Sequence, residues 1–329
     1  MARTNAADQD LDEACRFTDE YTGLRLRLRS ERLQPIAAAF EANLDRVRSM
    51  ASMIYVIAFW ADQMARHECQ ARHLIGVAPD DPSKDATPAM GAALEKVYDE
   101  FITRRAALGY DGANLDTWTK GARALAPVLA IKDERLPSGS THPVGRGISS
   151  LLGSMVSQAY GIYETLAVDI WIEALNANTS LGKNWFEARV NQNRNKTYQV
   201  SELLDHDFSL VGKIGTWLHR TNKASFLSLK DLRTNYEAAF GDAVRHVLEP
   251  MTELSATEKV RHLLAHRGGI VDERFLQDMS DHPVYGNTKV GDRVPLDGLL
   301  VRDHVAACAA GGTALAGWVD WFLEKGSGT

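Results

Sequence analysis

The chain has 329 residues, of which 45% are hydrophobic, 24% are charged and 8% are aromatic, with 25 glycines and 10 prolines. This composition is typical of a soluble globular protein and excludes collagen-like, mucin-like and intrinsically disordered chains. The 43 acidic and 37 basic residues give a net charge of −6, so a nucleic acid or an anionic membrane would have to meet a local basic patch. The length suits two domains, or one domain with a long extension.

Cysteine usage and the N-terminus indicate a cytoplasmic protein. Cys15, Cys69 and Cys308 lie far apart and form no CxxC pair, which favours a reducing compartment. Residues 1–20 are acidic and lack the basic and apolar regions of a signal peptide, so we expect 1–29 to form an acidic, mobile arm. The most apolar run, 50–60, is shorter than the ~20 residues that span a bilayer, and no membrane segment is predicted.

Residues 30–147 are expected to form a helical N-terminal region. Apolar residues recur at steps of three and four from Ser30 to about Leu74, which predicts one long helix. A Pro-, Asp- and Ser-rich loop follows at 78–91, and further helices are expected at 92–108 and 118–131. The Gly- and Pro-rich stretch 132–147 is the best linker, so a domain boundary is placed there.

Residues 148–329 continue the helical pattern. A long helix is predicted over 148–175, the asparagine-rich stretch 176–195 is expected to break regularity, and a closing helix is predicted over 299–323. Between them the pattern predicts shorter helices at 200–208, 210–220 and 232–248. A further helix is expected to start with a capping box of Ser255 and Glu258 and to stop at Gly268-Gly269. A polar segment without regular structure is expected at 278–297. Alternating strand patterns are scarce, so the predicted fold class is an all-α helical bundle.

The sequence gives little support for a metal site or for the common motifs of nucleotide-binding proteins and hydrolases. His67 and His73 are six residues apart, which places them on different faces of a helix, so they are interpreted as surface histidines. The triplet 205–207, Asp-His-Asp, has no further ligand at recognisable spacing. The chain contains neither GxxxxGK[ST] nor GxSxG, which removes the case for a P-loop NTPase or an α/β-hydrolase.

One segment, 259–275, concentrates polar chemistry on a helix that ends at two glycines. Arg261 and His266 are five residues apart, a net rotation of about 140°, so both can border one cleft at the helix end. His262 follows Arg261 directly. The physical alternative is a basic last turn that complements the helix dipole.

The segment resembles the signature of the HEPN superfamily, of the bacterial RiboL-PSP/MAE-like ribonuclease type. That motif is an arginine, a polar residue, three to five further residues and a histidine; here it corresponds to Arg261, His262 and His266. The following residues, GGIVDERF, extend the likeness, and the flanking long helices widen it to about 148–325. Residues 1–147 carry no such likeness.

The resemblance implies an all-α bundle that forms a homodimer with the motif helices apposed, and a metal-independent endoribonuclease from a toxin–antitoxin or antiphage defence system. It implies no cofactor. His262 stands where active families most often have asparagine. Other members are catalytically silent and serve as dimerisation, nucleotide-binding or partner-binding modules, which is the competing interpretation.

If the chain is a nuclease, each motif residue has an expected role. Arg261 would hold the scissile phosphate and His266 would act as acid or base, because an imidazole exchanges protons near neutral pH. His262 would orient His266 or the substrate, or transfer the second proton; alternatively, base and acid would come from the two His266 residues of a dimer. Attack by the ribose 2′-hydroxyl would leave a 2′,3′-cyclic phosphate and a 5′-hydroxyl.

Further contacts to RNA are expected from basic residues near the motif. Residues 183–233 contain nine basic and five acidic residues, which either line a phosphate track or form an ordinary solvated face. The side chains expected to contact RNA are Lys259, Arg267, Arg220 and Lys223. The expected partners are thus RNA, a second copy of the chain, and an antitoxin or regulatory protein.

Overall fold

The computed structural model describes residues 23–78, 87–107, 143–190, 209–221, 224–249 and 252–326. Every regular element in these ranges is a helix, apart from one isolated bridge between Ile270 and Arg293. The predicted all-α class is therefore confirmed. The chain divides into two compact units, one made of 1–49 together with 146–329 and the other of 50–145.

The first unit contains the segment that resembles the HEPN signature. Its elements are α2 (Leu24–Arg27), the start of α3 (Gln34–Leu74), α6 (Pro143–Ala177), α7 (Thr179–Val190), α9 (Ile214–Arg220), α10 (Leu229–Phe240), η2 (Asp242–Val244), α11 (Arg245–Leu248), α12 (Thr252–Arg267), α13 (Glu273–Asp278), η3 (Tyr285–Asn287) and α14 (Gly298–Gly326). The predicted helices at 148–175 and 299–323 correspond to α6 and α14.

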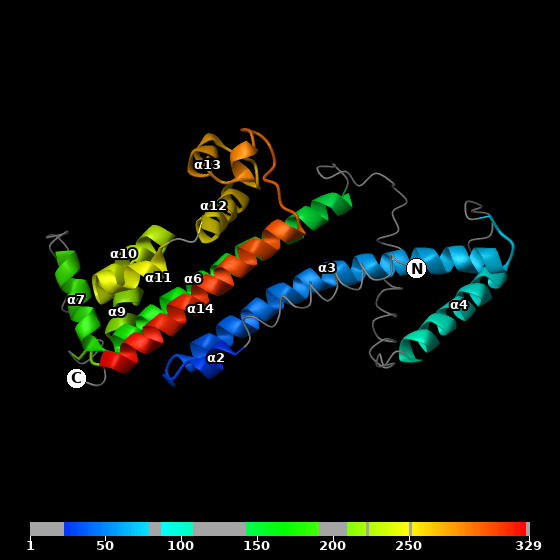
Figure 1. Cartoon of the computed structure of the whole chain (residues 1–329). Coiled ribbons are helices and arrows are strands. Elements are labelled where there is room, and N and C mark those ends of the chain that lie inside the picture. The colour runs from blue at the N-terminus through cyan, green and yellow to red at the C-terminus, as the bar shows by residue number, and fades with distance from the viewer. Residues whose placement is uncertain are drawn as a thin grey trace. The chain divides into compact units, whose positions relative to one another are not determined.

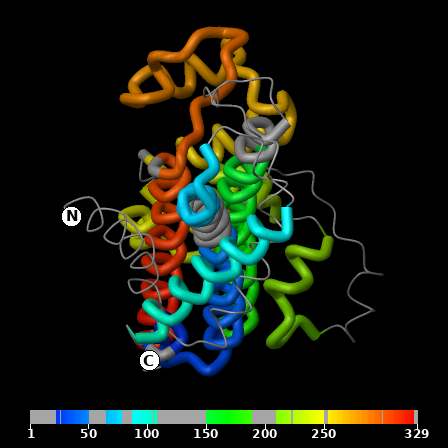
Figure 2. Tube along the Cα trace, turned by 90° about the vertical axis from the view of Figure 1, so that its right-hand side faces the viewer, coloured from blue at the N-terminus to red at the C-terminus, as the bar shows by residue number. Residues whose placement is uncertain are grey.

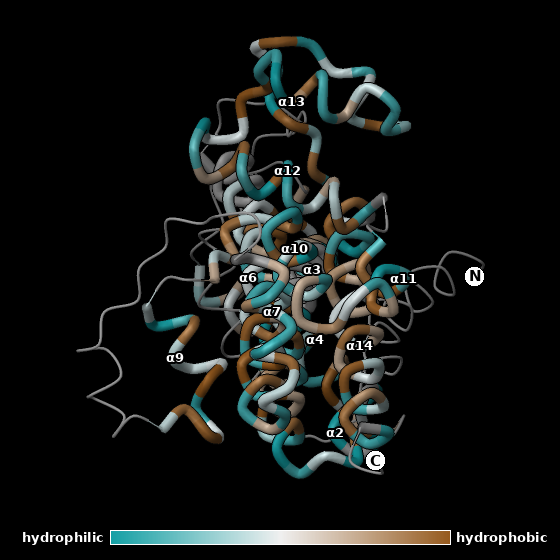
Figure 3. The backbone as a smooth tube through the Cα atoms, turned by 90° about the vertical axis from the view of Figure 1, so that its left-hand side faces the viewer, coloured by the Kyte–Doolittle hydropathy of each residue, from teal (hydrophilic) through white to brown (hydrophobic). Residues whose placement is uncertain are grey.

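The core of this unit lies where α6, α14 and the first turns of α3 run side by side (Figures 1 and 2). Brown hydrophobic stretches recur along α6 and α14 in Figure 3. The closest approach is at Gly312 of α14, where an added Cβ would lie 2.5 Å from Phe40 of α3 and 2.7 Å from Leu166 of α6. Gly312 therefore lets α3 and α6 approach α14 closely.

The segment 23–49 belongs to the first unit, whereas the sequence divided it between a mobile arm and an N-terminal region. Leu24 and Leu28 are buried, and Asp320 of α14 accepts hydrogen bonds from the backbone N–H groups of Arg29 and Ser30, at 2.9 and 2.8 Å. A carboxylate contributed from the other end of the chain therefore fixes these residues. Most of the predicted arm, 1–22, lies outside the described residues.

The expectation that 176–195 breaks regularity is wrong for 179–190, which α7 occupies, and 191–195 lie outside the described residues. The asparagines at its start act as caps. Asn178 accepts a hydrogen bond from the backbone N–H of Ser180, and the Asn176 side chain accepts one from the N–H of Gly215 at the start of α9. Asparagine satisfies free backbone groups at helix ends, so a cluster of asparagines can mark a junction between helices as well as an irregular loop.

The second unit contains the rest of α3 and α4 (Pro88–Ala107). Its small core is formed by Ala71, Met90, Ala93 and Val97. The predicted surface position of His67 is wrong: this side chain is 5% exposed and its ring lies 4.9 Å from that of Phe101. The predicted helix at 118–131 and most of the linker 132–147 lie outside the described residues. Among the helices that are described, none is long and apolar enough to cross a membrane.

Candidate active site

Helix α12 carries the segment that the sequence singled out, and its ends differ in how well they were predicted. It begins at Thr252, one turn before the expected cap at Ser255. Glu258 forms no capping box; its carboxylate accepts hydrogen bonds from the backbone N–H of Leu229, at 2.7 Å, and from the Tyr160 hydroxyl, at 3.2 Å. The helix stops at the predicted glycines, which have φ of 60° and 80° and so adopt the left-handed conformation that ends helices.

The chain after α12 folds back beside it. Val271 donates its backbone N–H to Asp292 and Val294 donates to Gly269, at 2.9 and 2.8 Å, which makes a short antiparallel ribbon. Asp272 then caps α13 by accepting the N–H of Phe275. As a result α13 contacts α12 and lies beside it in Figure 1.

The two histidines of the motif form a pair on the exposed side of α12. His262 and His266 are four residues apart, so they lie on one face, and their ring centroids are 4.5 Å apart. Both side chains are exposed. Partial burial lowers the pKa of His262, and the nearby positive charges of His266, Arg274 and Lys259 lower it further. The pair therefore resists holding two protons, and His262 is the member disposed to be neutral.

Arg261 points in a different direction, toward α6. Its guanidinium lies 3.6 Å from the carboxylate of Glu164 and 5.3 Å from the ring centroid of Tyr160. Burial raises the pKa of the Glu164 carboxyl, and the charge of Arg261 opposes that rise. The Arg261 side chain is still 37% exposed, so a phosphate can approach it. An ion pair and an aromatic face thus hold the cation at the edge of the histidine surface.

The other predicted RNA contacts fall into three groups. Lys259 and Arg267 border the motif, but each has an acidic neighbour: Lys259 lies 2.8 Å from Asp278, and Arg267 lies 3.5 Å from Asp272. Arg220 is exposed on α9, which contacts α7 and lies apart from α12 in Figures 1 and 3. Lys223 lies outside the described residues.

The predicted basic stretch 183–233 is partly neutralised by its own helices. Lys183 pairs with Glu187 at 3.7 Å, and Arg233 pairs with Glu237 at 2.7 Å. Both pairs are one helical turn apart, an arrangement that lowers the net field of the surface. Lys183 and Arg233 are therefore weaker phosphate contacts than a count of basic residues indicates.

A second histidine pair lies buried on another side of α12. His304 of α14 is 1% exposed; its Nδ1 is 2.8 Å from the Thr257 hydroxyl and its Nε2 is 2.6 Å from the Tyr285 hydroxyl. Burial lowers the pKa of His304 to about 4 and raises that of Tyr285. His282 accepts the backbone N–H groups of Val284 and Tyr285 at its Nδ1. These histidines join α12, α14 and the loop after α13.

Sequence reasoning did not find four residues that the structure adds to the surroundings of the motif. Tyr160 and Glu164 fix Arg261, while Arg274 and Arg293 are exposed arginines near α12. No local signal marks Tyr160, Glu164 or Arg293. Glu164, for example, contacts Arg261 across 97 positions of sequence, and its spacing on α6 is that of an ordinary surface residue. Arg274 falls within the extended likeness, and its charge reaches His262.

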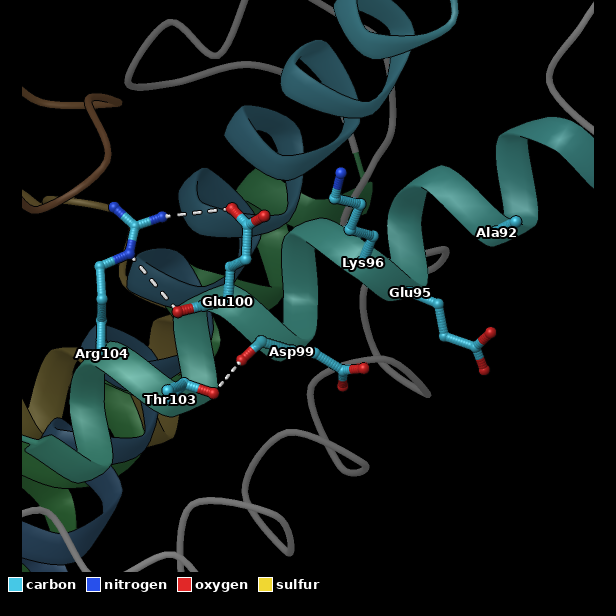
Figure 4. Close-up of a pocket in the computed structure, with 7 residues that line it drawn as sticks. All are labelled: Ala92, Glu95, Lys96, Asp99, Glu100, Thr103 and Arg104. Carbon is cyan, nitrogen blue, oxygen red and sulfur yellow. Dashed lines mark hydrogen bonds and ion pairs between the residues drawn. The ribbon is translucent and has the colours of Figure 1, made fainter.

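A hollow of about 650 Å³ in the second unit offers no comparable chemistry. It is lined by one face of α4 alone, from Ala92 to Arg104 (Figure 4). Its polar groups bond along their own helix, as when Thr103 donates to the Asp99 carbonyl at 2.8 Å. Within the described ranges, no group of three or more His, Cys, Asp or Glu side chains is arranged to hold a metal ion.

Among the described residues, the histidine pair and Arg261 on α12 are therefore the best candidate for an active site. Comparisons of the chain with protein-family models, with curated proteins and with solved structures found no match.

Proposed function

We propose that the chain is a metal-independent endoribonuclease of the HEPN type, with Arg261, His262 and His266 as its catalytic residues. The observation that carries this proposal is the exposed imidazole pair, 4.5 Å apart, on the same helix as Arg261, whose guanidinium is held by Glu164 and Tyr160. RNA cleavage by the 2′-hydroxyl needs a base, an acid and a fixed positive charge, and these three side chains can supply all of them.

The lowered pKa of His262 supports the role of base for this residue, which leaves the role of acid to His266. Neutral His262 accepts the proton of the 2′-hydroxyl as the 2′-oxygen forms its bond to phosphorus. Protonated His266 gives its proton to the 5′-oxygen as the P–O5′ bond breaks, while Arg261 stabilises the charge on the phosphorane. The products are a 2′,3′-cyclic phosphate and a 5′-hydroxyl. Acid and base come from one chain in this scheme, so chemistry does not depend on the homodimer that the family resemblance implies.

The competing function is a catalytically silent HEPN module that binds a nucleotide, a second copy or another partner. The Arg261–Glu164 contact favours it, because a substrate phosphate must compete with that carboxylate. Against it, Arg261 stays partly exposed, and neither motif histidine forms a hydrogen bond with the described residues. A role in toxin–antitoxin or antiphage defence belongs to the same proposal as the nuclease and rests on the family resemblance.

The test is cleavage of a labelled single-stranded RNA of mixed sequence in EDTA, with the product ends identified. Wild-type protein is compared with His266→Ala and His262→Ala, and with His73→Ala as an exposed-histidine control from the second unit. Cutting that leaves cyclic phosphate and disappears in the two motif variants supports the nuclease. A folded wild-type protein that leaves the RNA intact favours the silent module.

A further inference from the structure

A groove lies between α6 and α12, and it begins one helical turn after Arg261 on α12. Its volume is about 390 Å³. Helix α6 contributes hydroxyl and amide side chains, α12 contributes its last turn, and the ribbon after α13 contributes Arg293. The lining residues are Ser150, Gly153, Ser154, Ser157, Gln158, Leu264, Ala265, Gly268 and Arg293.

The groove continues the site rather than standing apart from it. Ala265 is one turn after Arg261 on α12, and Ser157 is three residues before Tyr160, whose ring faces Arg261. Arg261 and Gly268 are seven residues apart, which is about 10 Å along the axis of the helix. A chain bound at Arg261 could therefore run along the groove toward Arg293.

The chemistry of the lining suits a phosphodiester strand. None of the nine lining residues is acidic, although the chain as a whole carries a net charge of −6. The side chains of the three serines and Gln158 form no hydrogen bonds with the described residues, so their donors and acceptors are available. Arg293 is exposed and forms no ion pair within the described ranges, in contrast to Lys259 and Arg267.

Backbone packing explains why the groove stays narrow. An added Cβ at Gly153 would lie 3.1 Å from the Leu264 side chain, so α6 and α12 are in close contact beneath the hydroxyls. Neighbouring helices lie about 8–10 Å apart, and the depression between two of them is far narrower than a nucleic-acid duplex. The shape therefore favours one strand over two.

We propose that this groove binds single-stranded RNA next to the scissile position, with Arg293 holding a backbone phosphate and the serines of α6 contacting sugar and phosphate oxygens. The proposal rests on the proposed nuclease function and adds the place of the strand and its single-stranded form. It also moves the expected phosphate contact from Arg220 and Lys223 to Arg293.

The experiment measures binding separately from cleavage. Full-length His266→Ala protein, which should not cut, is titrated with a short fluorescein-labelled single-stranded RNA at several salt concentrations. Adding Arg293→Ala should weaken binding about tenfold and reduce the slope of log K against log salt by about 0.7, the value for one lost phosphate contact. The matched control is Arg25→Ala, an exposed arginine on α2 without an ion pair in the described structure, which should change binding less than twofold.

A second pair of variants tests the groove without touching an arginine. Ser154 is exposed on α6, so Ser154→Glu places a negative charge in the groove, and Ser154→Gln supplies similar bulk without charge. The glutamate should weaken RNA binding at least fivefold more than the glutamine. RNA duplex of the same sequence should bind less tightly than the single strand.

The outcomes separate the two proposals. If wild-type protein cuts RNA but Arg293→Ala and Ser154→Glu bind like their parent, the groove proposal is overturned and the nuclease stands. If the variants weaken binding while wild-type protein never cuts, the groove stands and the nuclease falls. Absence of both binding and cutting in folded protein overturns both.

Discussion

Helix α12 carries one pair of histidines and contacts a second pair; the first pair is exposed and the second is buried. His262 and His266 are exposed and form no hydrogen bonds with the described residues. His282 and His304 are buried, and both ring nitrogens of His304 have hydroxyl partners. Thr257, which meets His304, is nine residues before His266, and that spacing places the two on opposite faces of the helix.

This contrast shows that position, not residue type, separates histidines available for chemistry from histidines that support the fold. Burial lowers the pKa of His304 in the buried pair, and both of its ring nitrogens already have hydroxyl partners, so it has little to offer a substrate. The exposed pair keeps its ring nitrogens free and has a low tendency to hold two protons. Variants of the two pairs should accordingly affect different measurements.

The largest expected effect is on catalysis. His266→Ala should lower the cleavage rate by a factor of about 10² to 10⁴, the usual contribution of a proton-transfer group. Its free energy of unfolding should stay within about 0.5 kcal/mol of wild type, because the side chain is exposed. RNA cleavage and urea unfolding measure the two. A stable variant that retains the wild-type rate would remove His266 from the mechanism.

The buried pair should show the reverse. His304→Ala should lower the free energy of unfolding by about 4 kcal/mol, because it leaves a cavity and deprives the Thr257 and Tyr285 hydroxyls of their partner. The fraction that remains folded should still cleave RNA. Urea unfolding, with cleavage measured below the transition, tests both parts; an unchanged midpoint would contradict the structural role.

Protonation of His304 gives the next effect. Its pKa is about 4 in the folded protein and about 6.5 in the unfolded chain, so the unfolded state binds a proton first as pH falls. The stability due to this group is complete above pH 6.5 and is lost as pH falls to 4, by about 3 kcal/mol in total. His282 opposes protonation of His304 and Asp303 favours it.

Comparison with the variant isolates this contribution from that of the carboxylates, which titrate in the same range. The difference in unfolding free energy between wild type and His304→Ala should shrink as the pH is lowered from 7 to 4. A difference that stays constant over this range would show that His304 does not titrate with a lowered pKa.

The smallest expected effect comes from Tyr285→Phe, which removes one hydroxyl from the buried pair's network. Loss of its hydrogen bond to His304 should cost about 1–2 kcal/mol, with no effect on cleavage beyond that on folding. Thermal unfolding at pH 7 is the measurement. A loss of cleavage activity in Tyr285→Phe that exceeds its loss of folded protein would contradict the separation of the two pairs.

Local pattern was enough to predict the long helices α6 and α14 and the stop at Gly268-Gly269, because helical spacing and left-handed glycines act over a few residues. It singled out the segment that contains Arg261, His262 and His266, while the roles expected of these residues came from the family resemblance. It could not predict that Glu164 and Tyr160 hold Arg261, since those contacts join residues far apart in sequence.

Two misplaced residues show the same limit in another way. His67 has the spacing of a surface residue on α3, yet Tyr98 and Phe101 of α4 cover it. Asn176 stands in a stretch that has a loop-like composition, yet its side chain joins two helices. In both cases the deciding partner belongs to another helix, which no local window contains.

The contact between Asp320 and the backbone of Arg29 has a consequence for synthesis on the ribosome. These residues are 291 positions apart, so about 15 to 60 seconds pass between their incorporation at typical translation rates. Toward the end of that time α12 has been made but α14, which packs against it, has not. A nascent chain therefore carries the motif before its packing is complete, and α12 reaches its final surroundings only after α14 has been made.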